Sequence, residues 1–321
     1  MKVLLVRAGA LGDVLLLRRS IAALRFAGHR VELLAPAAGA ALVGAGASEV
    51  DRVWPWDGAE VTRVLSGDGT PGPFADALRS ADAVVAYTRS RSLTDALRSR
   101  ARLLLVHDPA PPARGPHASQ WFAQALTTLG VPEGPEPPEL RFSGEEQAWA
   151  ETLLRRLPPR FLAFHPGSGS DTKNWPADRF LALAERLHDD PALGPHPSLL
   201  VLGPAEADGV SPAAPATGTS LPEEDMPSLV VARELPLRVL GAVLSRAGFY
   251  VGNDSGVSHL AAAAGAPALA LFGPTDPALW APVGRHVRCL RAPRARMAQL
   301  TVEVALESAR GLLRSAQGAA Q

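Results

Sequence analysis

The sequence predicts an α/β protein with two consecutive doubly wound domains, each built on a parallel sheet. Three observations lead to this prediction. The chain has 321 residues, about twice a usual domain length. In both halves, short apolar runs typical of buried strands alternate with helical segments. A proline-rich stretch, Val131–Leu140, interrupts the alternation and is expected to be the linker. We therefore expect domains over residues 1–143 and 144–321, with a ligand-binding cleft between them.

The first half is predicted to contain five strands, because each apolar run is short and is followed by turn or helix signals. These strands are Lys2–Arg7, Arg30–Ala35, Glu49–Trp54, Asp82–Tyr87 and Arg102–His107. The predicted helices are Asp13–Ala27, Ala37–Gly46, Ser92–Ser99 and His117–Gly130. Asp57–Pro73 is rich in turn residues and is expected to lack regular structure.

The second half repeats this alternation after a helix that two prolines end. The predicted strands are Phe161–His165, Ser198–Gly203, Gly248–Gly252 and Pro267–Phe272. The predicted helices are Gly144–Leu157, Pro176–His188, Leu235–Arg246, Val257–Ala264 and Thr301–Ser315. Pro204–Pro227 is expected to be an irregular loop. We expect the final helix to pack either within its own domain or back on the N-terminal domain.

Composition excludes several classes of protein. Hydrophobic residues make up 47% and charged residues 20%, which indicates a folded globular chain. Lys and Arg number 32 and so do Asp and Glu, a balance that argues against a nucleic-acid partner. The single Cys289 excludes an intramolecular disulfide and a cysteine-rich zinc site. No apolar run reaches the roughly 20 residues of a membrane span. We expect a cytoplasmic protein whose membrane contact, if any, is peripheral at the inner face.

The first motif runs from Arg7 to Asp13, between a predicted strand and a helix. Free backbone N–H groups at a helix start favour an anion. The dinucleotide fingerprint needs three glycines there, and only Gly9 and Gly12 fit, which argues against a nicotinamide cofactor. Asp13 has two interpretations: an acidic residue that complements the helix dipole, or a general base at the cleft.

The second motif, HPGSGSDTKNWP at 165–176, also joins a strand to a helix. Its glycines allow close backbone approach to a ligand, its hydroxyls can donate hydrogen bonds, and Lys173 adds a compact positive charge. It is either a phosphate cradle or a flexible turn with a solvated lysine; it is not a P-loop, because Gly-Lys-Ser/Thr is absent. We interpret His165 as a packed strand-end residue.

The third motif, at 252–265, passes from a strand into an alanine-rich helix. The helix start either binds an anion or is capped by Asp254 or Ser255. His259 lies one turn into this helix and points at the same ligand or into the core. Together the motifs place a diphosphate on the second domain, with its reacting end facing Asp13. Because no metal-ligand cluster is evident, we expect no metal and no cofactor, with Lys173 and the helix dipole supplying the positive charge.

At these residues the sequence resembles glycosyltransferase family 9, the heptosyltransferase-like enzymes with the GT-B fold of two Rossmann-like domains. The matching stretches are LGDV at 11–14, HPGSGSDTKNWP at 165–176, VGNDSGVSHLAAAAG at 251–265 and LFGPTDPALWAPVG at 271–284. The resemblance implies an inverting, metal-independent transferase of lipopolysaccharide biosynthesis. Its donor would be a nucleotide diphosphate sugar, ADP-heptose by the family pattern, and its acceptor a lipopolysaccharide-core glycolipid or related glycan.

The resemblance also implies roles for individual residues. Asp13 matches the base that deprotonates the acceptor hydroxyl, and Lys173 the residue that stabilises the departing diphosphate. The residues implied in donor binding are Ser168, Gly169, Ser170, Glu206, Asp254, Ser255, Gly256 and His259. The chain departs from the family at Ala10, where many members have serine, and across Pro204–Pro227, where the nucleoside would bind. The identities of the nucleotide base, the sugar and the acceptor therefore do not follow from the match.

Two other functions fit the same fold. One is a nucleotide-sugar epimerase or hydrolase, which would release an epimer or free sugar without acceptor. The other is a non-catalytic protein that binds a nucleotide sugar and has no need of a carboxylate in the cleft.

Overall fold

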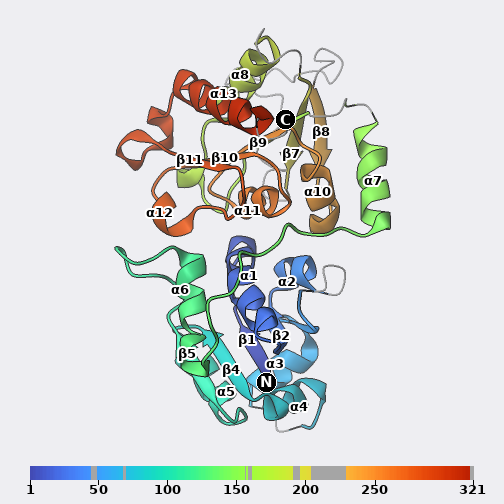
Figure 1. Cartoon of the computed structure of the whole chain (residues 1–321), viewed down its shortest axis with the longest axis vertical. Coiled ribbons are helices and arrows are strands. Elements are labelled where there is room, and N and C mark those ends of the chain that lie inside the picture. The colour runs from blue at the N-terminus through green and yellow to red at the C-terminus, as the bar shows by residue number, and fades with distance from the viewer. Residues whose placement is uncertain are drawn as a thin grey trace. The chain divides into compact units, whose positions relative to one another are not determined.

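The computed structural model describes residues 1–44, 49–67, 70–155, 157, 161–190, 196–203 and 229–318. The chain divides into two compact units, Met1–Arg141 and Phe142–Gln321 (Figure 1). Each unit contains one parallel sheet with helices packed against it. The predicted α/β class with two doubly wound, Rossmann-like domains is confirmed.

The sheet of the first unit has the order β3-β2-β1-β4-β5, and all neighbours are parallel. Its strands are β1 (Lys2–Val6), β2 (Arg30–Ala35), β3 (Arg52–Pro55), β4 (Ala83–Tyr87) and β5 (Leu104–His107). The central strands β1 and β4 are apolar throughout their buried length, because helices cover both faces. The strand order reverses between β1 and β4, so the loops after these two strands flank the switch point where such sheets bind ligands.

The helices of this unit form two groups: α1 packs against α2 and α6, and α3 packs against α4 and α5. Their bounds are α1 (Leu11–Phe26), α2 (Ala37–Val43), α3 (Ala59–Leu65), α4 (Pro73–Ser80), α5 (Arg91–Arg98) and α6 (Ala118–Gln124), followed by the 3₁₀ turn η1 (Thr127–Leu129).

The prediction that residues 57–73 lack regular structure was wrong. Helix α3 lies inside this range and α4 begins at its end. Val61 and Val64 are buried on one face of α3, in the same apolar cluster as Phe74 of α4. The Glu60 carboxylate accepts the Phe74 N–H at 2.6 Å and joins the two helices. Tertiary burial therefore outweighs the turn-forming composition of this segment.

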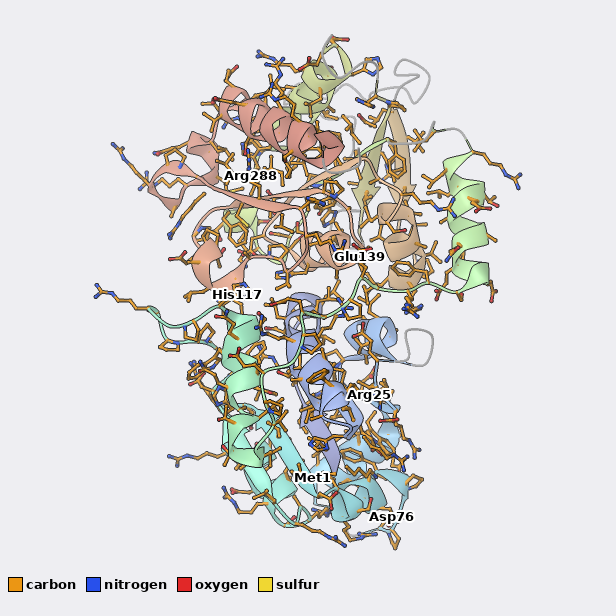
Figure 2. All side chains as sticks on the ribbon, in the orientation of Figure 1. Met1, Arg25, Asp76, His117, Glu139 and Arg288 are labelled. Carbon is orange, nitrogen blue, oxygen red and sulfur yellow. The ribbon has the colours of Figure 1, made fainter. Side chains whose placement is uncertain are left out.

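The proline-rich segment 131–140, which was expected to be the linker, belongs to the first unit and packs along α1. Arg18 Nη2 donates to the Pro138 carbonyl at 2.5 Å, and Arg19 pairs with Glu136. A Cβ at Gly134 would lie 2.4 Å from Ala23 Cα, so only glycine permits this close approach. A pocket of about 300 Å³ lies between α1 and residues 137–141; its lining includes Arg25 and Glu139, both labelled in Figure 2.

The sheet of the second unit has the order β11-β10-β9-β6-β7-β8, again with parallel neighbours. Its strands are β6 (Leu162–His165), β7 (Ser198–Leu202), β8 (Leu229–Arg233), β9 (Phe249–Asn253), β10 (Ala268–Phe272) and β11 (Val287–Arg291). The order reverses between β6 and β9, so the second and third motifs follow the two strands that flank the switch point.

The edge strands β8 and β11 were not predicted. Strand β11 reads VRCLR, and Arg288, labelled in Figure 2, interrupts its apolar run. An edge strand can carry a weaker apolar signal than a central one, as β11 does, whereas β8 reads LVVAR and was not predicted although its signal is apolar. On β11, burial raises the pKa of the Cys289 thiol to about 11, and the nearby Asp254 charge adds to this, so the thiol stays protonated near neutral pH.

The helices of the second unit are α7 (Gly144–Leu154), α8 (Ala177–His188), α10 (Leu237–Leu244), α11 (Gly256–Ala263), α12 (Pro277–Trp280) and α13 (Val302–Gly318), with 3₁₀ turns η2 (Asp171–Lys173), η3 (Pro293–Ala295) and η4 (Met297–Gln299). Helix α13 packs on α8 and on the edge formed by β10 and β11, within its own unit. None of the helices described is long and apolar enough to cross a bilayer.

Candidate active site

Asp13 lies in the first turn of α1, directly after the loop that leaves β1. Its Oδ1 accepts from Arg7 Nη2 at 2.5 Å, and its Oδ2 accepts the Ala10 N–H at 2.8 Å. Ala10 is the N-cap of α1 and has no polar side chain, so only the reciprocal half of a capping box is present, in which the Asp13 carboxylate accepts the Ala10 N–H. A carboxylate has about four lone-pair sites, of which partners among the described residues use two, and a fifth of the side chain is exposed. The geometry therefore fits both interpretations of Asp13, as a residue that complements the helix dipole and as a proton acceptor.

Arg7 is the buried partner that fixes Asp13. Its side chain is only 8% exposed, and Nη2 also donates to the Pro109 carbonyl at 3.0 Å. The guanidinium lies over the Phe122 ring, 5.1 Å from the ring centroid, and its Nε has no hydrogen-bond partner among the described residues. This cation fills the position where a dinucleotide site would need a glycine.

Gly9 lies against the carboxylate so closely that no side chain fits. A Cβ there would be 2.3 Å from Asp13 Oδ2, so the carboxylate could move aside only by breaking its hydrogen bonds with Arg7 and Ala10. We expect Gly9→Ala to displace Asp13, at a cost of about 1–3 kcal/mol in the free energy of unfolding, and to lower activity at the same time. The matched control is Gly144→Ala, because a Cβ at Gly144 meets nothing within 4 Å. Equal melting temperatures and activities for the two variants would contradict this expectation.

The loop after β6 is closed by its own hydroxyls. Ser168 Oγ lies 2.7 Å from Asn174 Oδ1 and 2.9 Å from the Ser170 carbonyl, and it accepts the Ser170 N–H at 3.3 Å. Ser170 Oγ and Thr172 Oγ1 are 2.9 Å apart, and Gly169 is exposed with open space around it. The loop thus has a built shape that leaves backbone and hydroxyls at Gly169 and Ser170 accessible.

Lys173 follows this loop and pairs with a buried carboxylate 81 residues away. Its Nζ lies 2.7 Å from Asp254 Oδ2, and Thr275 Oγ1 donates to the same oxygen at 2.5 Å. The Asp254 side chain is 7% exposed and that of Lys173 is 29% exposed. Of the 32 Lys and Arg residues in the sequence only two are lysines, Lys2 and Lys173. The chain therefore places one of its two compact, flexible cations at this site.

The turn after β9 leads directly into α11, and Ser255 is its N-cap. Ser255 Oγ accepts the Ser258 N–H at 3.4 Å, so of the two capping alternatives it is Ser255 that caps the helix. Asn253 joins this turn to the loop after β6: its Nδ2 donates to the Pro166 carbonyl at 2.6 Å, and its Oδ1 accepts the Trp175 N–H at 3.0 Å. Sequence reasoning missed Asn253, which is the last residue of the buried strand β9, and Thr275, which lies in the loop after β10.

The remaining predicted residues differ in their surroundings. His165 is buried at the end of β6, and its Nδ1 donates to the Val201 carbonyl at 3.0 Å, as expected of a packed strand-end residue. His259 is 5% exposed in the first turn of α11, and Gly256 is the first residue of that helix. Glu206 lies outside the described residues. Within the described ranges no three His, Cys, Asp or Glu side chains form a group that could hold a metal ion.

The chain is similar to several characterised proteins. It is 29% identical to lipopolysaccharide heptosyltransferase 1 of Escherichia coli K12 over 165 residues, or 50% of this chain and 48% of that protein. It is 30% identical to an E. coli lipopolysaccharide heptosyltransferase 3 over 122 residues, or 38% of this chain and 34% of that protein. The chain thus spans about half the length, or less, of the curated relatives it matches.

In fold, the chain is similar to a family 9 glycosyl transferase from Veillonella parvula, with a TM-score of 0.77 and 18% identity over 98% of this chain and 97% of that one. It is also similar to E. coli heptosyltransferase WaaC with ADP, with a TM-score of 0.69 and 23% identity over 97% of this chain and 100% of that one. At these identities the likeness concerns the fold alone. The model of the family described as glycosyltransferase family 9 (heptosyltransferase) matches residues 74–309, a range that includes both loops at the switch point of the second sheet. The chain therefore belongs to glycosyltransferase family 9.

Proposed function

We propose that this chain is an inverting glycosyltransferase that moves a heptose from ADP-heptose to a lipopolysaccharide-core or related glycan acceptor. The observation that carries the proposal is the anchored Lys173–Asp254 pair beside the N-terminus of α11, at the switch point of the sheet in the second unit. Family membership and the names of the relatives, lipopolysaccharide heptosyltransferases 1 and 3 and WaaC with ADP, support the choice of donor and acceptor.

In this proposal the second unit binds the donor. The diphosphate receives N–H donors from Ser255 and Gly256 and contacts the loop over Ser168, Gly169 and Ser170. Lys173 offsets its negative charge. Asp254 and His259 contact the donor's hydroxyls, and Glu206 is assigned to the nucleoside by resemblance only.

The first unit binds the acceptor and supplies the base. The acceptor oxygen forms a bond to the anomeric carbon while the bond from that carbon to the diphosphate oxygen breaks, which inverts the configuration. The acceptor proton passes to Asp13, and the electron pair of the broken bond leaves with the diphosphate. We propose that Lys173 and the dipole of α11 supply the positive charge without a metal, and that a lipid-linked acceptor is met by peripheral contact with the inner face of the membrane.

A nucleotide screen tests the donor. ADP-heptose at about 100 times its Kd should stabilise the protein by about 2.7 kcal/mol, which corresponds to a rise in Tm of ~5–10 °C for a unit of this size. GDP-, UDP- and dTDP-sugars at the same concentration are the controls, and each measurement is repeated in EDTA. A shift with another nucleotide alone would overturn the choice of ADP, and a shift abolished by EDTA would overturn metal independence.

Product analysis then separates the proposed transfer from the competing functions. Transfer requires acceptor and releases ADP in equal amount to the sugar transferred. Free sugar or an epimer formed without acceptor would identify a hydrolase or epimerase, and donor binding without turnover would identify a binding protein.

A further inference from the structure

Three loops of the second unit meet at a single atom, Asp254 Oδ2. Lys173 Nζ, from the segment after β6, lies 2.7 Å from it, and Thr275 Oγ1, from the loop after β10, donates to it at 2.5 Å. Asp254 itself follows β9, so the three loops leave three adjacent strands at the same edge of the sheet. The Thr275 hydroxyl and the Lys173 ammonium are thus both bonded to one carboxylate oxygen.

The loop that carries Thr275 is fixed at both ends. Asp276 Oδ1 accepts the Ala278 N–H at 3.0 Å and caps α12, and Asp276 Oδ2 lies 3.3 Å from Arg291 Nη1 of β11. At the other end, Gly273 packs so closely on Met297 that a Cβ would lie 2.9 Å from its Cγ. A hydroxyl held on so constrained a loop can restrict the rotation of the carboxylate that it contacts.

Lys173 needs such a constraint if it is to act at a defined place. A lysine side chain has high rotamer entropy, and its ammonium is a point charge without the planar fork that pre-organises arginine. Asp254 provides a strong anchor because it is almost completely buried and the ion pair is only part exposed. The position of the ammonium therefore depends on the orientation of the Asp254 carboxylate, which Thr275 helps to set.

We propose that Thr275 is a positioning residue that acts through Asp254 to hold Lys173 where the donor's diphosphate departs. The role of the diphosphate rests on the function proposed above; the positioning of the lysine does not. The observed contact of the Thr275 hydroxyl is with Asp254, so its role in this inference is to set the location of the charge on Lys173.

Because the sequence contains only two lysines, the surroundings of Lys173 can be measured by NMR without an activity assay. Lysine labelled with ¹³C at Cε gives two side-chain resonances, one from Lys173 and one from Lys2, which serves as an internal reference. Thr275→Val keeps the side-chain shape and removes the donor, whereas Thr275→Ser keeps the donor. We expect Thr275→Val to move the Lys173 resonance toward that of a free lysine and to leave Lys2 unchanged. Thr275→Ser should retain the wild-type spectrum.

Turnover gives a second, independent readout. A hydrogen bond to a charged group is strong enough for its loss to lower kcat about tenfold, with a smaller change in KM, and Thr275→Ser should restore most of kcat. In the Lys173→Ala background, Thr275→Val should cause no further loss, because the residue through which it acts is gone. Thr152→Val is the matched control: its hydroxyl donates to the Ala148 carbonyl at 3.0 Å on an exposed face of α7. That control should behave as wild type in both measurements.

The outcomes separate this inference from the proposed function. An unchanged Lys173 resonance in Thr275→Val overturns the positioning role, and so does an equal loss of turnover with and without Lys173. If Thr275→Val does not fold, Thr275→Ala removes the same donor without adding bulk and is held to the same criteria. A wild-type protein that performs no sugar transfer overturns the proposed function, while the lysine spectra still decide whether Thr275 positions Lys173.

Discussion

Asp13→Asn is expected to lower sugar transfer about 10²–10⁴-fold while donor binding is unchanged. An acceptor hydroxyl is a poor nucleophile until its proton is removed, and an amide of the same size cannot take that proton. The structure adds a cost in stability beyond the helix-dipole value, because the amide removes the charge partner of a buried arginine. Breaking such a pair costs up to about 3–5 kcal/mol, so we expect a lower Tm for this variant. Donor affinity should stay at the wild-type value, since the loops that we propose bind the donor belong to the other unit.

Three measurements on one purified protein decide the role of Asp13: Tm, donor affinity and kcat. The control is Asp82→Asn in the same unit, whose carboxylate accepts the Lys2 N–H at 2.7 Å at the start of β1. It should lose some stability and keep wild-type turnover. If Asp13→Asn also turned over at the wild-type rate, Asp13 would be a helix-capping residue only, and the proposed mechanism would lose its base.

Lys173→Ala is expected to lower kcat about 10²–10³-fold, a loss of roughly 2.7–4 kcal/mol of transition-state stabilisation. The ammonium gains interaction as negative charge develops on the departing diphosphate, so kcat should fall more than the affinity for nucleotide. The variant should also lose stability, because without Lys173 the buried Asp254 keeps the hydrogen bond from Thr275 but has lost the positive charge that it paired with. We therefore expect Asp254→Asn to recover part of the Tm lost in Lys173→Ala.

The other lysine provides the control for this variant. Lys2 Nζ lies 3.0 Å from Glu32 Oε1 and 2.9 Å from Ser80 Oγ in the first unit, so Lys2→Ala removes an ion pair of similar kind far along the sequence from the donor loops. Its kcat should match that of wild type. A rise in KM for Lys173→Ala with unchanged kcat would show that Lys173 only binds the donor.

The sequence predicted the fold best where burial is two-sided. Central strands such as β4 and β10 are continuous apolar runs with one interpretation, whereas arginines interrupt β11, which was not predicted. Helix α3 was not predicted because its two buried valines, Val61 and Val64, lie among turn-forming residues in the sequence. These errors have one cause: a single sequence shows a residue's own preference, while short or edge elements depend on neighbours that lie far away along the chain.

For the site, strand ends located the two loops that we propose bind the donor, but not the contacts between them. The residue types at Lys173 and Asp254 were singled out separately, and no pattern in the sequence pairs side chains 81 positions apart. Thr275 lies in the GPTDP stretch that carried part of the family resemblance, yet only the register of β9 and β10 brings its hydroxyl to the carboxylate. The register of a sheet is a tertiary property, which explains why this contact could not be derived from the motifs.

The meeting of three loops at Asp254 Oδ2 also limits how their lengths can change. Surface loops usually tolerate insertions, but one added residue can shift a chain by up to about 3.3–3.6 Å, more than the range of a hydrogen bond. The connections after β6, β9 and β10 should therefore be fixed in length relative to one another. At the opposite edge of the sheet, Gly265 ends α11 with a φ of 93° and connects it to β10 without contacting this carboxylate. Loops at the amino ends of the strands can thus vary in length without disturbing the site. Loops at the carboxyl ends of β6, β9 and β10 cannot.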